Sequence, residues 1–99
     1  MKNYEIANVN QALGGLMNEK IRGRLKFKLF KNKRLAEDAV KLIAESFEGI
    51  EDSEERLEIM DEEQELKIDK FTLDELEPLA LSVSDISMLE PIIEFEEEA

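Results

Sequence analysis

The sequence contains no cysteine and no histidine among its 99 residues. Without Cys there is no disulfide and no thiolate nucleophile, and without either residue nearly every zinc or other transition-metal site is excluded. An enzyme would have to work with carboxylates, Lys, Tyr4, Ser or Thr, and the sequence has no Gly-rich phosphate-binding loop. We therefore expect no enzymatic activity, no catalytic residues, no metal site and no cofactor.

Long apolar runs are also missing. No stretch approaches the roughly 18 apolar residues that span a bilayer, and the N-terminus MKNYEIANVN has no apolar run of signal-peptide length. The simplest expectation is a cytoplasmic protein that has no membrane partner. Because single hydrophobic cores are most often built from about 100–150 residues, we expect residues 1–99 to form one domain.

Positive charge is scarce and is concentrated in one segment. The chain has 25 acidic and 13 basic side chains, which give a net charge of −12. Eight of the 13 basic residues lie between Lys20 and Arg34, with no acid among them. Residues 1–34 carry nine basic and two acidic side chains (net +7), and residues 35–99 carry four and 23 (net −19). The candidate partner-binding residues are Arg22, Arg24, Lys26, Lys28, Lys31, Lys33 and Arg34.

The first helix is predicted from helical spacing. Val9, Ala12, Leu13, Leu16 and Met17 follow the i, i+3, i+4, i+7, i+8 pattern, which places them on one face. Asn8 is a good N-cap residue, and Gln11 occupies the reciprocal capping position. The pattern predicts a helix from Asn8 to Met17.

The basic segment can be interpreted as a strand or as a helix. From Ile21 to Leu29, apolar or small residues alternate with basic ones, which is typical of a β-strand. Helical spacing instead continues without a breaker into Leu35–Phe47, and Lys, Arg and Leu are good helix formers. We favour one helix from Arg22 to Phe47, ended by Gly49.

The second half of the chain contains shorter segments. The acidic connection 48–64 is expected to be either a short surface helix, capped at Asp52, or a mobile linker. Residues 65–71 alternate as a strand, and residues 79–81 can return beside them. Thr72 and Ser82 are capping residues; a final helix is expected near Ser84 to Ile93, and the acidic tail 94–99 is expected to fray.

The expected fold is α+β and predominantly helical. It consists of a helical hairpin with a long central helix, a small two-stranded extended element and a short C-terminal helix. The residues predicted to form its core are Val9, Leu13, Leu16, Leu25, Leu29, Leu35, Ile43, Phe47, Ile68, Leu81, Ile86 and Leu89.

The basic segment has several possible partners. Its side chains can pair with the acidic half of the same molecule or bind another protein. Direct nucleic-acid binding, with Phe27 and Phe30 stacking on bases, is disfavoured because the whole molecule is strongly negative. The acids do not form a calcium loop, because DEEQE from Asp61 lacks the spaced ligands and glycine of that motif.

The acidic residues permit two alternatives. A compact acidic protein can imitate the phosphate charge of DNA and inhibit a host DNA-binding or defence protein, and residues 45–65 supply the charge density. Neighbouring copies can also assemble through their basic and acidic halves into a homo-oligomer. Our primary hypothesis remains a non-enzymatic module that binds another protein through the basic helix.

The chain resembles small proteins encoded by tailed bacteriophages and prophages. The resemblance rests on AN-x-x-QAL-x-x-L at Ala7–Leu16, FKL-x-KN at Phe27–Asn32 and LKIDKFTLDELEPLALSVSDISMLEPII at Leu66–Ile93. It implies that FKL-x-KN belongs to a long helix, and it supplies no activity and no site residues. The acidic connection of this chain is shorter than that of the proteins it resembles. The resemblance implies a phage protein in the host cytoplasm that acts as an assembly accessory, a structural accessory or a modulator of a host protein.

Overall fold

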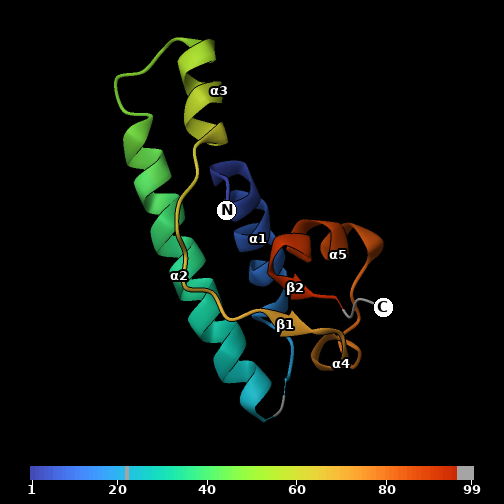
Figure 1. Cartoon of the computed structure of the whole chain (residues 1–99). Helices are drawn as coiled ribbons and strands as arrows, with labels where there is room; N and C mark the ends of the chain where they lie inside the picture. The colour runs from blue at the N-terminus through green and yellow to red at the C-terminus, as the bar shows by residue number, and fades with distance from the viewer. Residues whose placement is uncertain (22, 96–99) are drawn as a thin grey trace.

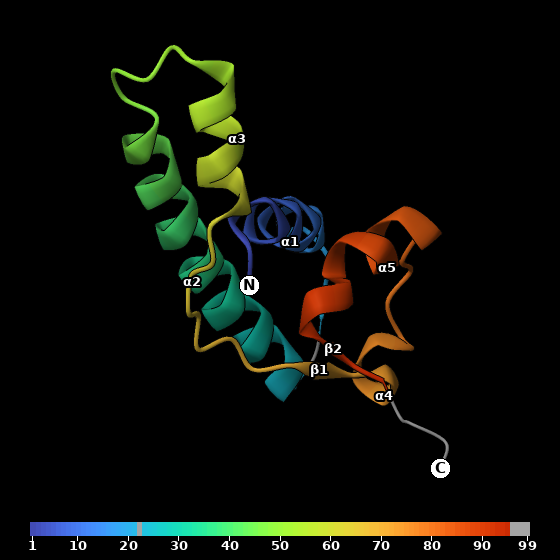
Figure 2. The same cartoon turned by 45° about the horizontal axis from the view of Figure 1, so that its top comes forward.

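The computed structural model describes residues 1–21 and 23–95, which form five α-helices, one short 3-10 helix and two short strands (Figure 1). The long helix α2 (Arg24–Ser46) lies along one side of the molecule. Helix α1 (Asn3–Leu16) packs between α2 and helix α5 (Val83–Leu89), as Figures 1 and 2 show from two directions. The predominantly helical α+β fold with a helical hairpin and a long central helix is confirmed. Within the described residues, no helix combines the length and the apolar character needed to cross a membrane.

Helix α2 confirms the helical interpretation of the basic segment. Its buried residues are spaced three and four apart, as a helix with one inward face requires: Leu29, Asn32, Ala36, Ala39 and Ile43. Residue 22, predicted as the first of this helix, lies outside the described residues. The helix is followed by Gly49, whose φ of 77° is in the left-handed region that favours glycine.

Helix α1 begins earlier than predicted, so the N-cap assignment of Asn8 was wrong. Asn3 is buried at the start of the helix, where its amide nitrogen donates to the Ile59 carbonyl at 2.6 Å. The Asn3 amide oxygen accepts from Gln64 at 2.8 Å. These contacts join residues more than 50 positions apart in the chain, and they attach the start of α1 to α3 and to the chain that follows it.

The acidic connection 48–64 contains helix α3 (Ser53–Asp61), the first of the two expected outcomes. The Asp52 carboxylate accepts a hydrogen bond from the Glu54 backbone N–H at 3.0 Å, as predicted for a cap. No residue of this helix is buried. It packs on α1 and on α2, and Lys2 pairs with Asp61 at 2.9 Å.

The predicted pairing of residues 65–71 with 79–81 was wrong. The two-stranded sheet consists of β1 (Phe71–Thr72) and β2 (Ile93–Glu94), which pair in parallel with Phe71 opposite Ile93. Parallel strands need a connection of about a dozen residues or more, which residues 73–92 provide. Helix α4 (Leu73–Leu76) begins directly after β1, where Thr72 and Glu75 form the expected capping box.

The C-terminal helix ends earlier than predicted. Ser82 caps α5 through a hydrogen bond from the Asp85 N–H at 3.0 Å. Pro91 cannot donate a backbone hydrogen bond, and the chain forms the 3-10 helix η1 (Glu90–Ile92) in place of a continued α-helix. Ile93, predicted as the last residue of this helix, belongs to strand β2 together with Glu94, the first residue of the predicted tail. Residues 96–99 lie outside the described residues.

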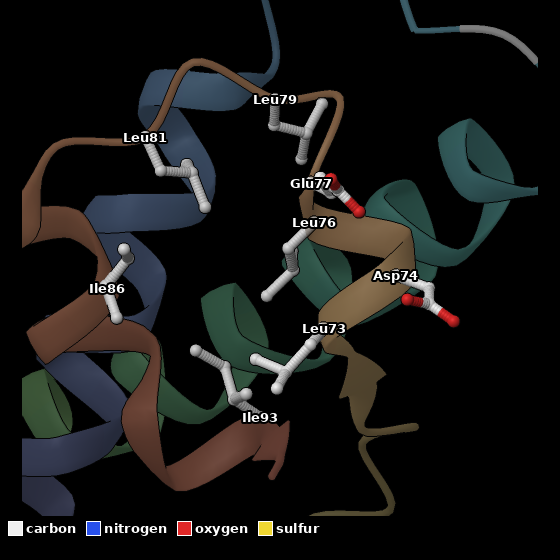
Figure 3. Close-up of a pocket in the computed structure, with 8 residues that line it drawn as sticks. All are labelled: Leu73, Asp74, Leu76, Glu77, Leu79, Leu81, Ile86 and Ile93. Atoms are coloured by element: carbon white, nitrogen blue, oxygen red, sulfur yellow. The ribbon is translucent and has the colours of Figure 1, made fainter. Parts of the chain in front are cut away.

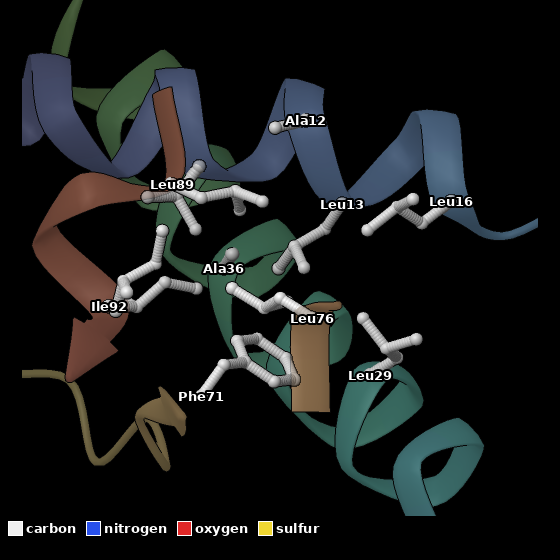
Figure 4. Packing of buried hydrophobic residues seen from close by; sticks show 11 residues of the cluster. Ala12, Leu13, Leu16, Leu29, Ala36, Phe71, Leu76, Leu89 and Ile92 are labelled. Atoms are coloured by element: carbon white, nitrogen blue, oxygen red, sulfur yellow. The ribbon is translucent and has the colours of Figure 1, made fainter. Parts of the chain in front are cut away.

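The main core lies where α1, α2, α4 and α5 meet. Phe71 is fully buried there, among side chains such as Leu13, Ala36 and Leu76 (Figure 4). The buried apolar residues outside the predicted core are Ile6, Ala12, Ala36, Ala39, Phe71, Leu76, Ile92 and Ile93. The assignment of Ile86 to the core was wrong, because its side chain is 41% exposed. The predicted core residues that are only partly buried are Leu25, Leu35, Phe47, Ile68 and Leu81.

Candidate functional site

The basic side chains predicted to bind a partner fall into two groups. Lys28, Lys31 and Lys33 contact other parts of the protein. Arg24, Lys26 and Arg34 are exposed, and no ion pair joins them to any described acid. Arg22 lies outside the described residues. The predicted binding segment is therefore partly structural.

Lys28 connects α2 to the segment that contains β1 and α4 through side-chain contacts. Its ammonium group lies 2.8 Å from the Glu75 carboxylate, donates to the Lys70 carbonyl and lies 5.2 Å from the centre of the Phe71 ring. The Lys28 hydrogen bond lowers the pKa of Glu75, and a hydrogen bond from the Thr72 N–H acts in the same direction. Because Lys28 has three internal contacts, we assign it a structural role.

Asn32, which lies between Lys31 and Lys33 in the sequence, is a buried polar residue whose partners the sequence did not reveal. Its amide donates to the Asp69 carbonyl at 2.8 Å and accepts from the Asp69 N–H at 3.2 Å. Lys31 adds an exposed ion pair to the Asp69 carboxylate at 3.0 Å. Lys33 donates to the Asn10 side chain on α1 at 2.7 Å. The inward contacts of α2 thus hold both α1 and the extended chain before β1.

The outer side of α2 carries two exposed aromatic side chains. Phe27 is 69% exposed and Phe30 is 55% exposed. The two are three residues apart and share one helix face, away from Leu29. Lys26 places its ammonium 5.2 Å from the centre of the Phe27 ring, and Arg34 follows Phe30 by about one helical turn. We define the aromatic–basic face as Arg24, Lys26, Phe27, Phe30 and Arg34.

The basic residues of this face were predicted from the sequence as partner-binding residues. Its two aromatic residues were not predicted to contact a protein. Phe27 and Phe30 were considered as residues that stack on nucleic-acid bases or are buried in the core, and Phe27 also as part of the alternating strand pattern. Their position outside the apolar stripe through Leu25 and Leu29 was visible in the sequence. That position could have identified both as exposed.

The fold separates this face from acidic helix α3. Acidic helix α3 packs near the C-terminal end of α2, whereas the aromatic–basic face occupies its N-terminal half (Figure 1). From Lys26 to Glu45, α2 rises by about 30 Å. This separation exceeds the roughly 8 Å Debye length at physiological ionic strength. The charge of α3 is therefore largely screened at Lys26, whereas Glu37 and Asp38 follow Arg34 within about one turn of α2.

The aromatic–basic face is suited to binding and lacks an arrangement for metal chemistry. No group of three or more carboxylates able to hold a metal ion occurs in residues 1–21 and 23–95. Burial of exposed Phe rings against apolar surface is favourable in free energy, and Arg and Lys beside them can pair with carboxylates.

Comparisons with protein-family models, curated protein sequences and solved structures found no match.

Proposed function

We propose that this protein is a non-enzymatic interaction module that binds another protein through the aromatic–basic face of α2. The observation that carries the proposal is the exposure of Phe27 and Phe30 between Lys26 and Arg34. Aromatic residues and Arg are enriched at the energetic centres of protein interfaces. The expected partner surface is apolar at its centre and carries carboxylates at its rim.

The choice of a protein partner over nucleic acid follows from charge. The net charge of −12 opposes the approach of a polyanion, and internal contacts occupy Lys28, Lys31 and Lys33. A small interface with a protein needs only a few charges around an apolar centre. The resemblance to small phage proteins supports a setting in the host cytoplasm, as an assembly accessory or a modulator of a host protein.

Affinity capture from a bacterial lysate tests the proposal. Two variants weaken the face: Phe27→Ala with Phe30→Ala, and Lys26→Ala with Arg34→Ala. Leu42→Ala removes another exposed apolar side chain of α2 and is the control for the aromatic variant. Lys67→Ala with Lys70→Ala is the control for the basic variant, because both double variants change the net charge from −12 to −14.

The expected result is one captured protein that both face variants lose and both controls retain. Each face variant should weaken binding of that protein by about tenfold or more, as removal of central interface side chains does. Equal capture by the wild type and by both face variants would contradict the proposal. Salt-resistant binding to DNA fragments would also contradict it.

A second candidate function, imitation of nucleic acid, is favoured by the structure of the acidic connection. Such a mimic needs carboxylates at fixed positions, and α3 places Glu54, Glu55 and Glu58 on one helix. Neutralising these three residues to Gln distinguishes the candidates in the same capture experiment. Loss of capture only in this acidic variant would favour mimicry over binding through α2.

A further inference from the structure

An apolar groove lies between α4, the connection 79–81, α5 and β2 (Figure 3). It encloses about 370 Å³ and is open to solvent. That volume is at the small end of the range for ligand pockets, about 300–1,000 Å³. Its apolar lining consists of Leu73, Leu76, Leu79, Leu81, Ile86 and Ile93.

Two carboxylates flank this groove. Asp74 and Glu77 lie at the α4 edge of the groove, and Figure 3 shows their carboxylates pointing outward from the apolar side chains. Neither forms an ion pair with a described basic residue. Leu73 and Ile86, which line the groove, are 44% and 41% exposed. The groove therefore offers an apolar centre with a negative rim, which is the surface that the aromatic–basic face requires.

We infer that the groove receives the aromatic–basic face of a second copy of this chain. This inference rests on the proposed function, because it uses the same face of α2 and identifies one partner for it. In the contact, Phe27 or Phe30 enters the apolar groove of the neighbouring copy. Lys26 and Arg34 then lie near Asp74 and Glu77 of that copy, so both members of each opposite-charge pair come from exposed surfaces.

The contact joins two molecules, because one chain cannot fill its own groove. Lys28 is paired with Glu75, which fixes α4 beside the inner side of α2. Phe30 lies about 160° around the helix from Lys28, so it is turned away from α4. Phe27 is 69% exposed and does not line the groove of its own chain. The C-terminal sequence EEEA at 96–99 has the same charge sign as the groove rim, which disfavours it as the occupant.

The two surfaces lie on different parts of the chain, so the contact is head-to-tail. Each copy that uses its α2 face leaves its groove free for another copy, and assembly continues or closes as a ring. The contact is small compared with stable interfaces, which bury about 1,200–2,000 Å². We therefore expect weak association that depends on protein concentration.

Sedimentation of the full chain tests the inference with two variants that each remove one surface. Phe27→Ala with Phe30→Ala removes the aromatic side chains and leaves the groove intact. Ile86→Lys places a positive charge in the groove and leaves α2 intact. Leu42→Ala and Val83→Lys are the matched controls on the same helices, and Val83 is 85% exposed outside the groove lining. Thermal unfolding of each variant establishes that it is folded.

The measurement covers about 10 μM to 1 mM protein at about 0.15 M salt, where repulsion between negative copies is largely screened. We expect wild type and both controls to form species larger than a dimer as concentration rises. Each surface variant alone should associate at least about tenfold more weakly. An equimolar mixture of the two surface variants should form a 1:1 dimer and nothing larger, because only one intact face meets one intact groove.

Three results would overturn the inference. If the wild type stays monomeric at every concentration, the inferred contact between copies is contradicted. The proposed function then still stands if capture from the lysate depends on the α2 face. A mixture that fails to form the 1:1 dimer excludes the head-to-tail contact. Control variants that weaken association as strongly as the surface variants show that the contact lies elsewhere.

Discussion

Replacing Asn32 with Leu should remove the main polar attachment between α2 and the chain that leads into β1. Asn32 is fully buried and makes two hydrogen bonds with the Asp69 backbone, at 2.8 Å and 3.2 Å. Leu has a similar size but leaves the Asp69 N–H and carbonyl without these partners. An unsatisfied buried polar group costs about 1–3 kcal/mol. Because the Asp69 side chain is 57% exposed, water can reach part of this site, and we expect a total loss of about 2–4 kcal/mol in the free energy of unfolding.

Such a loss is a large share of the stability of a small domain, which is about 5–15 kcal/mol. It corresponds to a fall in Tm of about 10–25 °C for a chain of this size. Urea unfolding followed by circular dichroism measures the change. The control is Asn8→Leu, the same substitution at an exposed position of α1, which should change stability by less than about 0.5 kcal/mol. A loss below about 1 kcal/mol for Asn32→Leu, or one equal to that of the control, would refute the reasoning.

Three further predictions concern charge and backbone conformation. Glu75→Gln should destabilise the protein at neutral pH, because the hydrogen bond from Lys28 lowers the folded-state pKa of Glu75. The loss in the free energy of unfolding is fully present above the ordinary Glu pKa of about 4.3 and should shrink as the pH falls below it. Urea unfolding of both proteins between pH 7 and pH 3 checks this, and a deficit that stays constant would contradict it. Gly49→Ala should destabilise by about 1–2 kcal/mol, because φ is 77° there. Gly15→Ala should stabilise the protein by up to about 1 kcal/mol, because an added Cβ meets no atom within 4 Å at this position in the last turn of α1. Thermal unfolding of the Gly49 and Gly15 variants should show shifts of opposite sign.

Local sequence features predicted much of the fold because their physical causes are local. The stripe from Leu29 to Ile43 identified α2 despite the alternation at 21–29, since apolar residues three and four apart form one helix face. Asp52, Thr72 and Ser82 were recognised as caps because each bonds a backbone N–H two or three residues away. These interactions require no knowledge of distant parts of the chain.

The candidate site could be predicted only in part. The concentration of basic residues in one segment was visible in the sequence, but the use of each residue was not. Lys28 and Lys33 meet groups 47 and 23 positions away, so their loss from the binding surface depends on how α2 is packed. The apolar groove also escaped prediction, because residues 73–81, Ile86 and Ile93 meet only after the parallel pairing of β1 with β2.

The sequence by itself determined the helical class, the long basic helix, the separation of charge along the chain and the lack of Cys and His chemistry. Composition and short-range periodicity contain that information. The tertiary structure alone decided where α1 begins, which strands pair and which basic side chains remain exposed. The reason is that Asn3, Asn32 and Lys28 act through contacts 37 to 61 positions apart, and such contacts leave no pattern in neighbouring residues.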